Sequence, residues 1–243
     1  MSAARKLFWP GLVTGLALAV TLSLGVWQTQ RLAWKEALID KIAARSGQAA
    51  RPLPLRSTWA TLAPADYDFT PVTARGRFDT AREALVFSGP PPGLGDDPGW
   101  FVVSPFQLAD GGVVLVDRGF IANSKRKTTA RRQGATADVT ITGSMRAPQS
   151  RNAFTPADAP DKGEFFTADP TAIAAALKAT GAAPFMVTLA PDSAPAGVDL
   201  PHPVPGRPEL PNNHFSYAVT WFSLALVVAV IFSLYARSVL KPK

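Results

Sequence analysis

Two long apolar stretches lie near the two ends of the chain. Residues 7–27 and residues 215–235 contain no charged side chain. A helix needs about 20 mostly apolar residues to cross the hydrocarbon core of a bilayer, and both stretches reach that length. The pattern therefore predicts two transmembrane helices, over residues 7–27 and 214–235.

The first stretch has an alternative interpretation as a cleaved signal peptide, because Arg5 and Lys6 precede it and small residues occur within it. However, its small-x-small triplet, residues 17–19, falls inside the apolar run rather than after it. The run is also long for a signal peptide, so an uncleaved membrane anchor is the favoured prediction.

Residues 28–213, between the two stretches, have the length of one typical domain. They open with apolar residues at helical spacing, so the first span is expected to continue as an amphipathic helix over residues 28–42. Pro52 and Pro54 end this helix. Beyond them, runs rich in Val, Ile, Phe and Thr between turn residues predict six strands, over residues 71–78, 83–88, 100–108, 113–120, 139–146 and 185–189.

Turns and one short helix complete this domain. Residues 109–112 include two glycines and predict a hairpin turn. Residues 169–181 predict a helix with Asp169 as N-cap and Gly181 as its stop. Residues 191–211 contain seven prolines and are expected to form an extended connector. The predicted fold class is α+β, with two transmembrane helices flanking one antiparallel β-rich domain.

The charge distribution predicts how the chain is oriented in the membrane. The tails, residues 1–6 and 236–243, hold five of the 25 Lys and Arg residues and none of the 18 Asp and Glu residues. By the positive-inside rule, both termini are expected in the cytoplasm. The segment between the spans carries only 20 − 18 = +2, so the basic composition indicates no nucleic-acid partner. The short N-terminal tail favours a bacterial inner membrane, with the central domain in the periplasm.

The residue inventory excludes several kinds of chemistry. The chain has no cysteine, three methionines and two histidines, so thiol chemistry and soft-metal transfer are excluded. His202 lies between two prolines of the connector, where a solvated linker residue is expected. A basic cluster of residues 125–127 with Arg131 and Arg132 could bind anionic head groups or an acidic partner, although a solvated loop is favoured. No catalytic residue is assigned and no enzymatic activity is predicted.

Helical spacing gathers aromatic and polar side chains at the expected periplasmic edge of the membrane. Two stripes result, with His214, Tyr217 and Trp221 at the start of the second span and Trp27, Arg31 and Trp34 at the end of the first. If the stripes face each other, they would suit a haem, with His214 as axial iron ligand, aromatic rings against the macrocycle and Arg31 or Lys35 on the carboxylates. The alternative is that Trp and Tyr gather at membrane interfaces whatever the function, and that His214 only begins a helix.

Short motifs follow one another along almost the whole chain. They are Gly25 to Gln28 with Arg31, Leu32, Trp34, Lys35, Leu38 and Ile39; Gly76 to Phe78; residues 99–106 and 114–120; and Asn212 to His214 with Tyr217, Ala218 and residues 220–222. In this order, with two spans flanking one domain, they resemble the surfeit locus protein family of cytochrome c oxidase assembly factors.

The resemblance implies a membrane-anchored, non-enzymatic factor that binds haem a and assists its delivery to the catalytic subunit of the oxidase, with haem A synthase as a further partner. The family's histidine at the head of the second span falls on His214, as the expected axial ligand. The chain departs from the family pattern at Phe120, Ala122 and Ala168, and Ala168 replaces an arginine that is often present in that loop. The alternative function is a scaffold that binds no haem and stabilises intermediates of oxidase assembly.

Overall fold

The computed structural model describes residues 3–127, 137–194, 201–204 and 212–241. The chain separates into two compact units. One unit comprises Met1–Lys41 with Leu210–Lys243, and the other comprises Ile42–Glu209.

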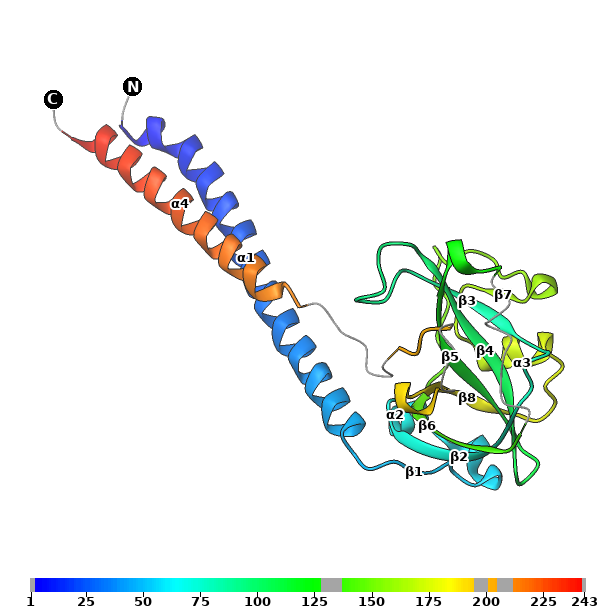
Figure 1. Ribbon diagram of the computed structural model, residues 1–243. Coiled ribbons are helices and arrows are strands. Elements are labelled where there is room, and N and C mark those ends of the chain that lie inside the picture. Colours follow the sequence, from blue (N-terminus) through cyan, green and yellow to red (C-terminus); the bar gives the residue numbers. More distant parts are fainter. Residues whose placement is uncertain (1–2, 128–136, 195–200, 205–211, 242–243) are drawn as a thin grey trace. The chain divides into compact units, whose positions relative to one another are not determined.

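Two long antiparallel helices make up the first unit (Figure 1). Helix α1 spans Ala3–Ser46 and helix α4 spans His214–Leu240. Near the chain termini, the Tyr235 hydroxyl donates a hydrogen bond of 3.3 Å to the Lys6 carbonyl oxygen. Because α1 is continuous through residues 28–42, the expected extension of the first span as a helix is confirmed.

The surface of this helical hairpin is apolar along most of its length. Both helices are long and apolar enough to cross a membrane, judged by length and composition. Large apolar side chains on both helices are exposed, which is unfavourable in water and favourable in lipid; they include Leu12, Val13 and Leu16 on α1, and Leu226, Val227 and Ile231 on α4.

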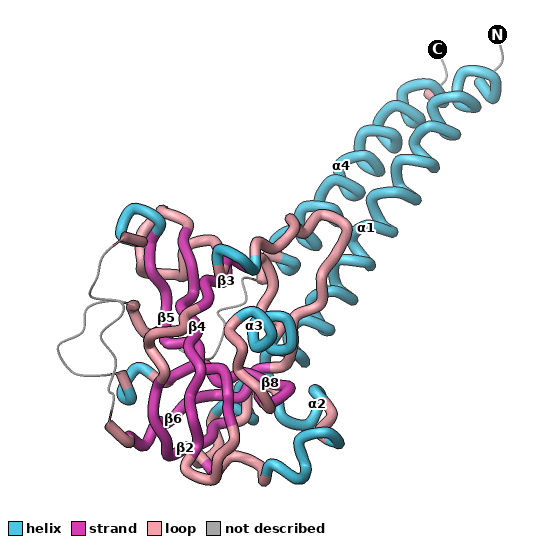
Figure 2. Tube along the Cα trace, turned by 90° about the vertical axis from the view of Figure 1, so that its right-hand side faces the viewer, coloured by secondary structure: helices cyan, strands magenta, loops and turns pink. Residues whose placement is uncertain are grey.

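A small closed barrel forms the centre of the second unit (Figure 2). Its strands pair in the ring order β2-β6-β8-β5-β4, and the ring closes where β4 pairs with β2. The five strands are β2 (Pro71–Phe78), β4 (Gly99–Leu108), β5 (Val113–Ala122), β6 (Val139–Arg146) and β8 (Ala182–Leu189). The α+β fold class, with two candidate membrane helices and a β-rich domain, is therefore confirmed.

The barrel closes at a glycine. Gly76 of β2 pairs with Leu108 of β4, and a Cβ atom at Gly76 would lie 2.0 Å from the Gln107 carbonyl oxygen. Only a residue without a side chain allows the two backbones to approach this closely. Gly76 is therefore required for β2 to pair with β6 along most of its length and with β4 at its end.

Alternation along the strands produces two apolar layers. Val114 and Val116 of β5 point into the barrel, where they join Phe106 and Phe185. The intervening Leu115 points outward and packs in a second cluster. That outer cluster is covered by α3 (Pro170–Ala176), by β3 (Ala84–Ser88), which extends the sheet beyond β4, and by the two-residue strand β7 (Glu164–Phe165).

All six predicted strands are observed, with shifts at some of their ends. β8 begins at Ala182 rather than at residue 185, and β5 continues to Ala122. The domain is not purely antiparallel, because β5–β8, β3–β7 and β1 (Arg51–Pro52) with β2 are parallel pairs. Within the described residues, five short helices were not predicted: the 3-10 helices η1 (Arg56–Thr61), η2 (Asn123–Lys125), η4 (Pro160–Lys162) and η5 (Pro191–Ser193), and α2 (Pro64–Tyr67). The segment expected as an extended connector therefore begins with a helical turn, η5.

The predicted helix of residues 169–181 is shorter in the structure but begins where expected. The Asp169 carboxylate accepts hydrogen bonds from the backbone amides of Thr171 and Ala172, at 2.9 and 3.5 Å, and so caps α3. Helix α3 ends at Ala176, and Gly181 has a φ of +69°, in the turn that leads into β8.

Part of the proline-rich connector is fixed to the barrel. The backbone of His202 exchanges two hydrogen bonds of 2.8 Å with Phe120, as in an antiparallel strand pair. The His202 side chain is half-buried. The prediction of a solvated linker residue at His202 is therefore wrong, because the chain adds a backbone bridge to the end of β5 there.

Candidate functional site

His214 is the first residue of α4, and its ring contacts α1. The Nδ1 atom of His214 lies 2.7 Å from the Oε1 atom of Gln28, which comes from the middle of α1. Gln28 is only 8% exposed, an unusual burial for a polar side chain in such an apolar pair of helices. The two helices therefore meet through a specific polar contact at the head of α4.

Small residues bring the two helices close together beside this contact. A Cβ atom at Gly25, one turn before Gln28, would lie 2.7 Å from the ring of Phe222. On α4, Ala218 and Ala225 are each 4% exposed. Small residues of this kind allow close approach of membrane helices. Close packing at Gly25 is thus compatible with the direct contact of Gln28 and His214.

The contact with Gln28 bears on which ring nitrogen of His214 carries the proton. An amide oxygen can only accept a hydrogen bond, so with Oε1 of Gln28 facing the ring, this contact favours the tautomer that carries the proton on Nδ1. The second nitrogen, Nε2, then keeps its lone pair. Histidines that bind metals commonly donate their other N–H to an oxygen acceptor in this way. The contact with Gln28 therefore favours the form of His214 that can bind a metal through Nε2.

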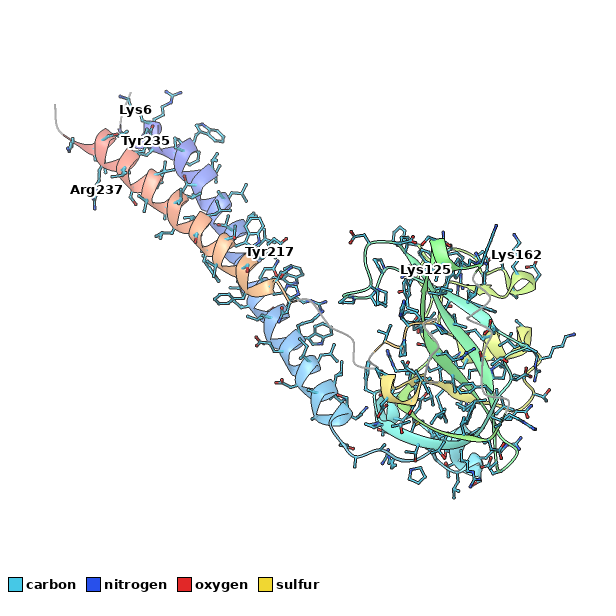
Figure 3. All side chains as sticks on the ribbon, in the orientation of Figure 1. Lys6, Lys125, Lys162, Tyr217, Tyr235 and Arg237 are labelled. Carbon is cyan, nitrogen blue, oxygen red and sulfur yellow. The ribbon has the colours of Figure 1, made fainter. Side chains whose placement is uncertain are left out.

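The other predicted site residues of α4 lie at the same end of the hairpin. In Figure 3, Tyr217 is at the opposite end of the helix pair from Lys6, Tyr235 and Arg237. The side chain of Tyr217 is 56% exposed, whereas that of Trp221 is half-buried.

The predicted residues of α1 occupy a different face from the one expected. Trp27 and Trp34 are 50% and 52% exposed, and Arg31 is exposed with its guanidinium carbon 4.3 Å from the centre of the Trp34 ring. Lys35 is half-buried. The expectation that the two aromatic stripes face each other is wrong, because α1 presents Gln28 to His214 and leaves Trp27, Arg31 and Trp34 at the surface.

Gln28 is the residue that the sequence interpretation missed. It belongs to the recognisable motif at the end of the first span, but no role was assigned to it. The signal that could have identified it is a polar side chain three residues after Gly25, the spacing that places both on one helix face.

The barrel domain contains a second group of polar residues, in a cavity of about 290 Å³ lined by Phe101, Asp117, Arg146, Thr188 and others. Burial raises the pKa of Asp117 from 3.8 to about 6, against the opposing effects of a hydrogen bond from the Gly119 amide and the charge of Arg146. Asp117 and Thr188 lie on neighbouring strands, β5 and β8, and the Thr188 hydroxyl donates a hydrogen bond of 3.5 Å to the Asp117 carboxylate.

Charged pairs elsewhere in the domain are structural in character. Arg118 and Glu83 form an almost fully buried ion pair of 2.9 Å, and burial lowers the pKa of Arg118. In the predicted basic cluster, Arg126 pairs with Glu164, while Arg131 and Arg132 lie outside the described residues. Within the described residues, no three His, Asp or Glu side chains are grouped so as to hold a metal ion.

Comparison with known proteins supports the family resemblance that the motifs along the chain indicate. The family model described as the SURF1 family matches residues 15–226, from within α1 to within α4. The chain belongs to the SURF1 family.

The relatives in animals match the same long region. Surfeit locus protein 1 of Mus musculus is 31% identical over 233 residues, which cover 88% of this chain and 71% of that protein. Surfeit locus protein 1 of Homo sapiens is 30% identical over 228 residues, covering 86% of this chain and 71% of that protein. The SURF1-like protein of Drosophila melanogaster is 33% identical over 232 residues, covering 88% and 73%. The match to the SURF1 family model therefore includes the barrel domain and part of each long helix.

Proposed function

We propose that this SURF1 family protein is a cytochrome c oxidase assembly factor that binds haem a at the head of its helical hairpin. In this role it is a carrier rather than an enzyme. It delivers haem a to the catalytic subunit of the oxidase and receives it from haem A synthase.

The observation that carries the proposal is the state of His214. Its Nδ1 is bonded to Gln28 at 2.7 Å, and the lone pair of Nε2 is left for an axial bond to haem iron. One imidazole ligand suits a cargo that must be released, because a second strong ligand would slow the transfer.

The surroundings of His214 fit the rest of a haem. Aromatic rings of α4 offer apolar surface to the macrocycle; these are the exposed Tyr217 and the half-buried Trp221, at helical spacing from His214. Lys35, half-buried and two turns after Gln28 on α1, supplies positive charge for a carboxylate. An apolar hairpin whose surface suits lipid is also a suitable place for a largely apolar cargo.

The proposed location follows from the charge of the tails. Basic residues flank both spans on the side of the termini, so the proposal places both termini in the cytoplasm and the barrel domain in the periplasm of a bacterial inner membrane. His214 then lies at the periplasmic edge, where the second span begins.

The test is the visible spectrum of the purified full-length protein after co-expression with the enzymes that make haem A. The wild type is expected to carry haem a and His214→Ala to lose it, with unchanged far-ultraviolet circular dichroism. His202→Ala is the matched control, because it removes the only other histidine and should leave the spectrum unchanged. A folded wild type without haem would overturn the carrier function and favour the scaffold.

A further inference from the structure

Gln28 forms a polar link across an otherwise apolar helix pair. Within the described residues, its contact with His214 is the one hydrogen bond between side chains of α1 and α4. Gln28 is 8% exposed, so water has little access to its amide. A buried polar group that loses its partner destabilises a structure, so this pair favours one particular alignment of the two helices.

We propose that Gln28 is a positioning residue that holds His214 in the tautomer with the proton on Nδ1, and that the ligand site at Nε2 therefore exists only while α1 and α4 are packed together. The statement about the tautomer stands by itself. Its consequence for haem rests on the proposed function.

The first step of the argument concerns the proton. A neutral imidazole carries one proton, and either nitrogen can hold it. A proton on Nε2 would occupy the lone pair that a metal needs. The Oε1 atom of Gln28 at 2.7 Å stabilises the other tautomer, because only a protonated Nδ1 can donate to it. Gln28 thus selects the form of His214 that can bind a metal.

The second step concerns orientation. A hydrogen bond to one nitrogen fixes the ring plane and hence the direction of the lone pair on the opposite nitrogen. His214 stands at the first position of α4, where the residues before it, Asn212 and Asn213, are outside the helix. Asn213 makes no side-chain cap bond, so the ring of His214 is held from α1 rather than by its own helix end.

The third step links the site to helix packing. Gln28 lies on the same face of α1 as Gly25, which the ring of Phe222 approaches closely. Separation of the helices at Gly25 would therefore withdraw Oε1 from His214 and release the imidazole. By linkage, a cargo that binds Nε2 favours the packed hairpin, and opening of the hairpin favours release of the cargo.

The first experiment measures the tautomer in the full-length protein without cargo. The chain has only two histidines, so a sample labelled with ¹⁵N-histidine gives two imidazoles, and His202→Ala leaves that of His214 alone. At a pH where the ring is neutral, we expect a protonated Nδ1 and an unprotonated Nε2 in the wild type. In Gln28→Leu, signal from the tautomer protonated on Nε2 should appear, and in Gln28→Glu the wild-type tautomer should persist because a carboxylate also accepts.

Gln30→Leu is the matched control, since it makes the same change at an exposed position of α1. It should leave the His214 spectrum unchanged. A wild type protonated on Nε2, or a Gln28→Leu protein with the wild-type tautomer and a folded hairpin, would overturn the proposal. If Gln28 had only a structural role, Gln28→Leu would lower the stability of the protein without changing the tautomer of His214.

The second experiment adds haem a to four proteins: wild type, Gln28→Leu, Gln28→Glu and Gln30→Leu. Gln28→Leu is expected to bind it about 10-fold to 100-fold more weakly than wild type and Gln30→Leu do, as is usual for loss of an outer-shell partner. The iron–histidine stretching frequency of the reduced complex should rise in the order Leu, Gln, Glu at residue 28, as the acceptor becomes stronger. Equal affinity and equal frequency across the series would refute the positioning role. If the wild type binds no haem, the proposed function fails, while the tautomer measurement still decides the role of Gln28.

Discussion

Gly119 allows the connector to pair with the barrel, and its replacement gives a clear test of that contact. Gly119 has a φ of +128°, a conformation that residues with side chains rarely adopt. A Cβ atom there would lie 2.2 Å from the carbonyl oxygen of His202. Gly119→Ala therefore introduces backbone strain and also pushes the connector away from β5.

The expected cost can be estimated from these two effects. A strained backbone conformation costs on the order of 1–3 kcal/mol. Displacement of His202 breaks its two 2.8 Å hydrogen bonds with Phe120, each worth about 1 kcal/mol. The sum is about 3–5 kcal/mol, a large part of the 5–15 kcal/mol that typically stabilises a domain. For a domain of this size, the melting temperature should fall by about 10 °C.

Substitutions at two other glycines distinguish the effect of backbone strain from the effect of the steric contact with His202. Gly111 also has a positive φ, +85°, but nothing lies within 4 Å of a Cβ placed there. Gly89 has neither a positive φ nor a close neighbour. Gly111→Ala should therefore lose only about 1 kcal/mol, and Gly89→Ala should be close to wild type.

The assays are thermal unfolding of the full-length protein in detergent and hydrogen exchange of the Phe120 and His202 amides. Gly119→Ala should expose both amides to exchange, whereas Gly111→Ala should leave both protected. Equal losses of stability in Gly119→Ala and Gly111→Ala, with both amides still protected, would refute the steric argument.

Two further predictions concern the barrel. Burial raises the pKa of Asp117 from 3.8 to about 6, so the folded domain binds this proton more tightly than the unfolded chain does. The contribution of Asp117 to the free energy of unfolding therefore falls as the pH rises from about 4 to about 6, and this fall is at most about 3 kcal/mol. Denaturation of wild type and Asp117→Asn at several pH values should show this difference between the proteins, and a constant difference would contradict it. Phe185→Ala removes a fully buried ring from the barrel and should lower the free energy of unfolding by about 3–5 kcal/mol in the same assay. Phe154→Ala, at a ring that is 95% exposed, should lower it by almost nothing. Similar losses of stability in the two variants would contradict a core position for Phe185.

The parts of the fold that follow from local patterns were predictable. Uncharged runs of about 20 residues define the two long helices, and Asp169 with Pro170 marks the start of α3. Barrel closure was not predictable, because it depends on pairing Gly76 with Leu108 across 32 residues of chain, and no local signal encodes that register. The parallel pairing of β5 with β8 could not be predicted for the same reason, because it joins strands that are far apart in the sequence.

The candidate site was half predictable. His214 stands out because histidine is rare in this chain and this one begins an apolar helix. Helical spacing correctly groups residues on one helix, but it cannot determine how two helices are rotated relative to each other. For that reason Trp27 and Trp34 were expected against α4, where the structure has Gln28 instead.

A single hydrogen bond thus connects three properties that a haem carrier of the proposed kind requires. The pair of Gln28 and His214 favours one register of α1 on α4, since a slip along either helix would leave a buried amide without a partner. In the proposed tautomer the same bond leaves Nε2 of His214 for a ligand, and the small residues Gly25 and Ala218 let the helices come close enough for the bond to form. Because the ligand site depends on both helices, α4 alone should hold haem poorly even with His214 intact. Under the proposed function, anything that changes the packing of the hairpin would then control binding and release of the cargo.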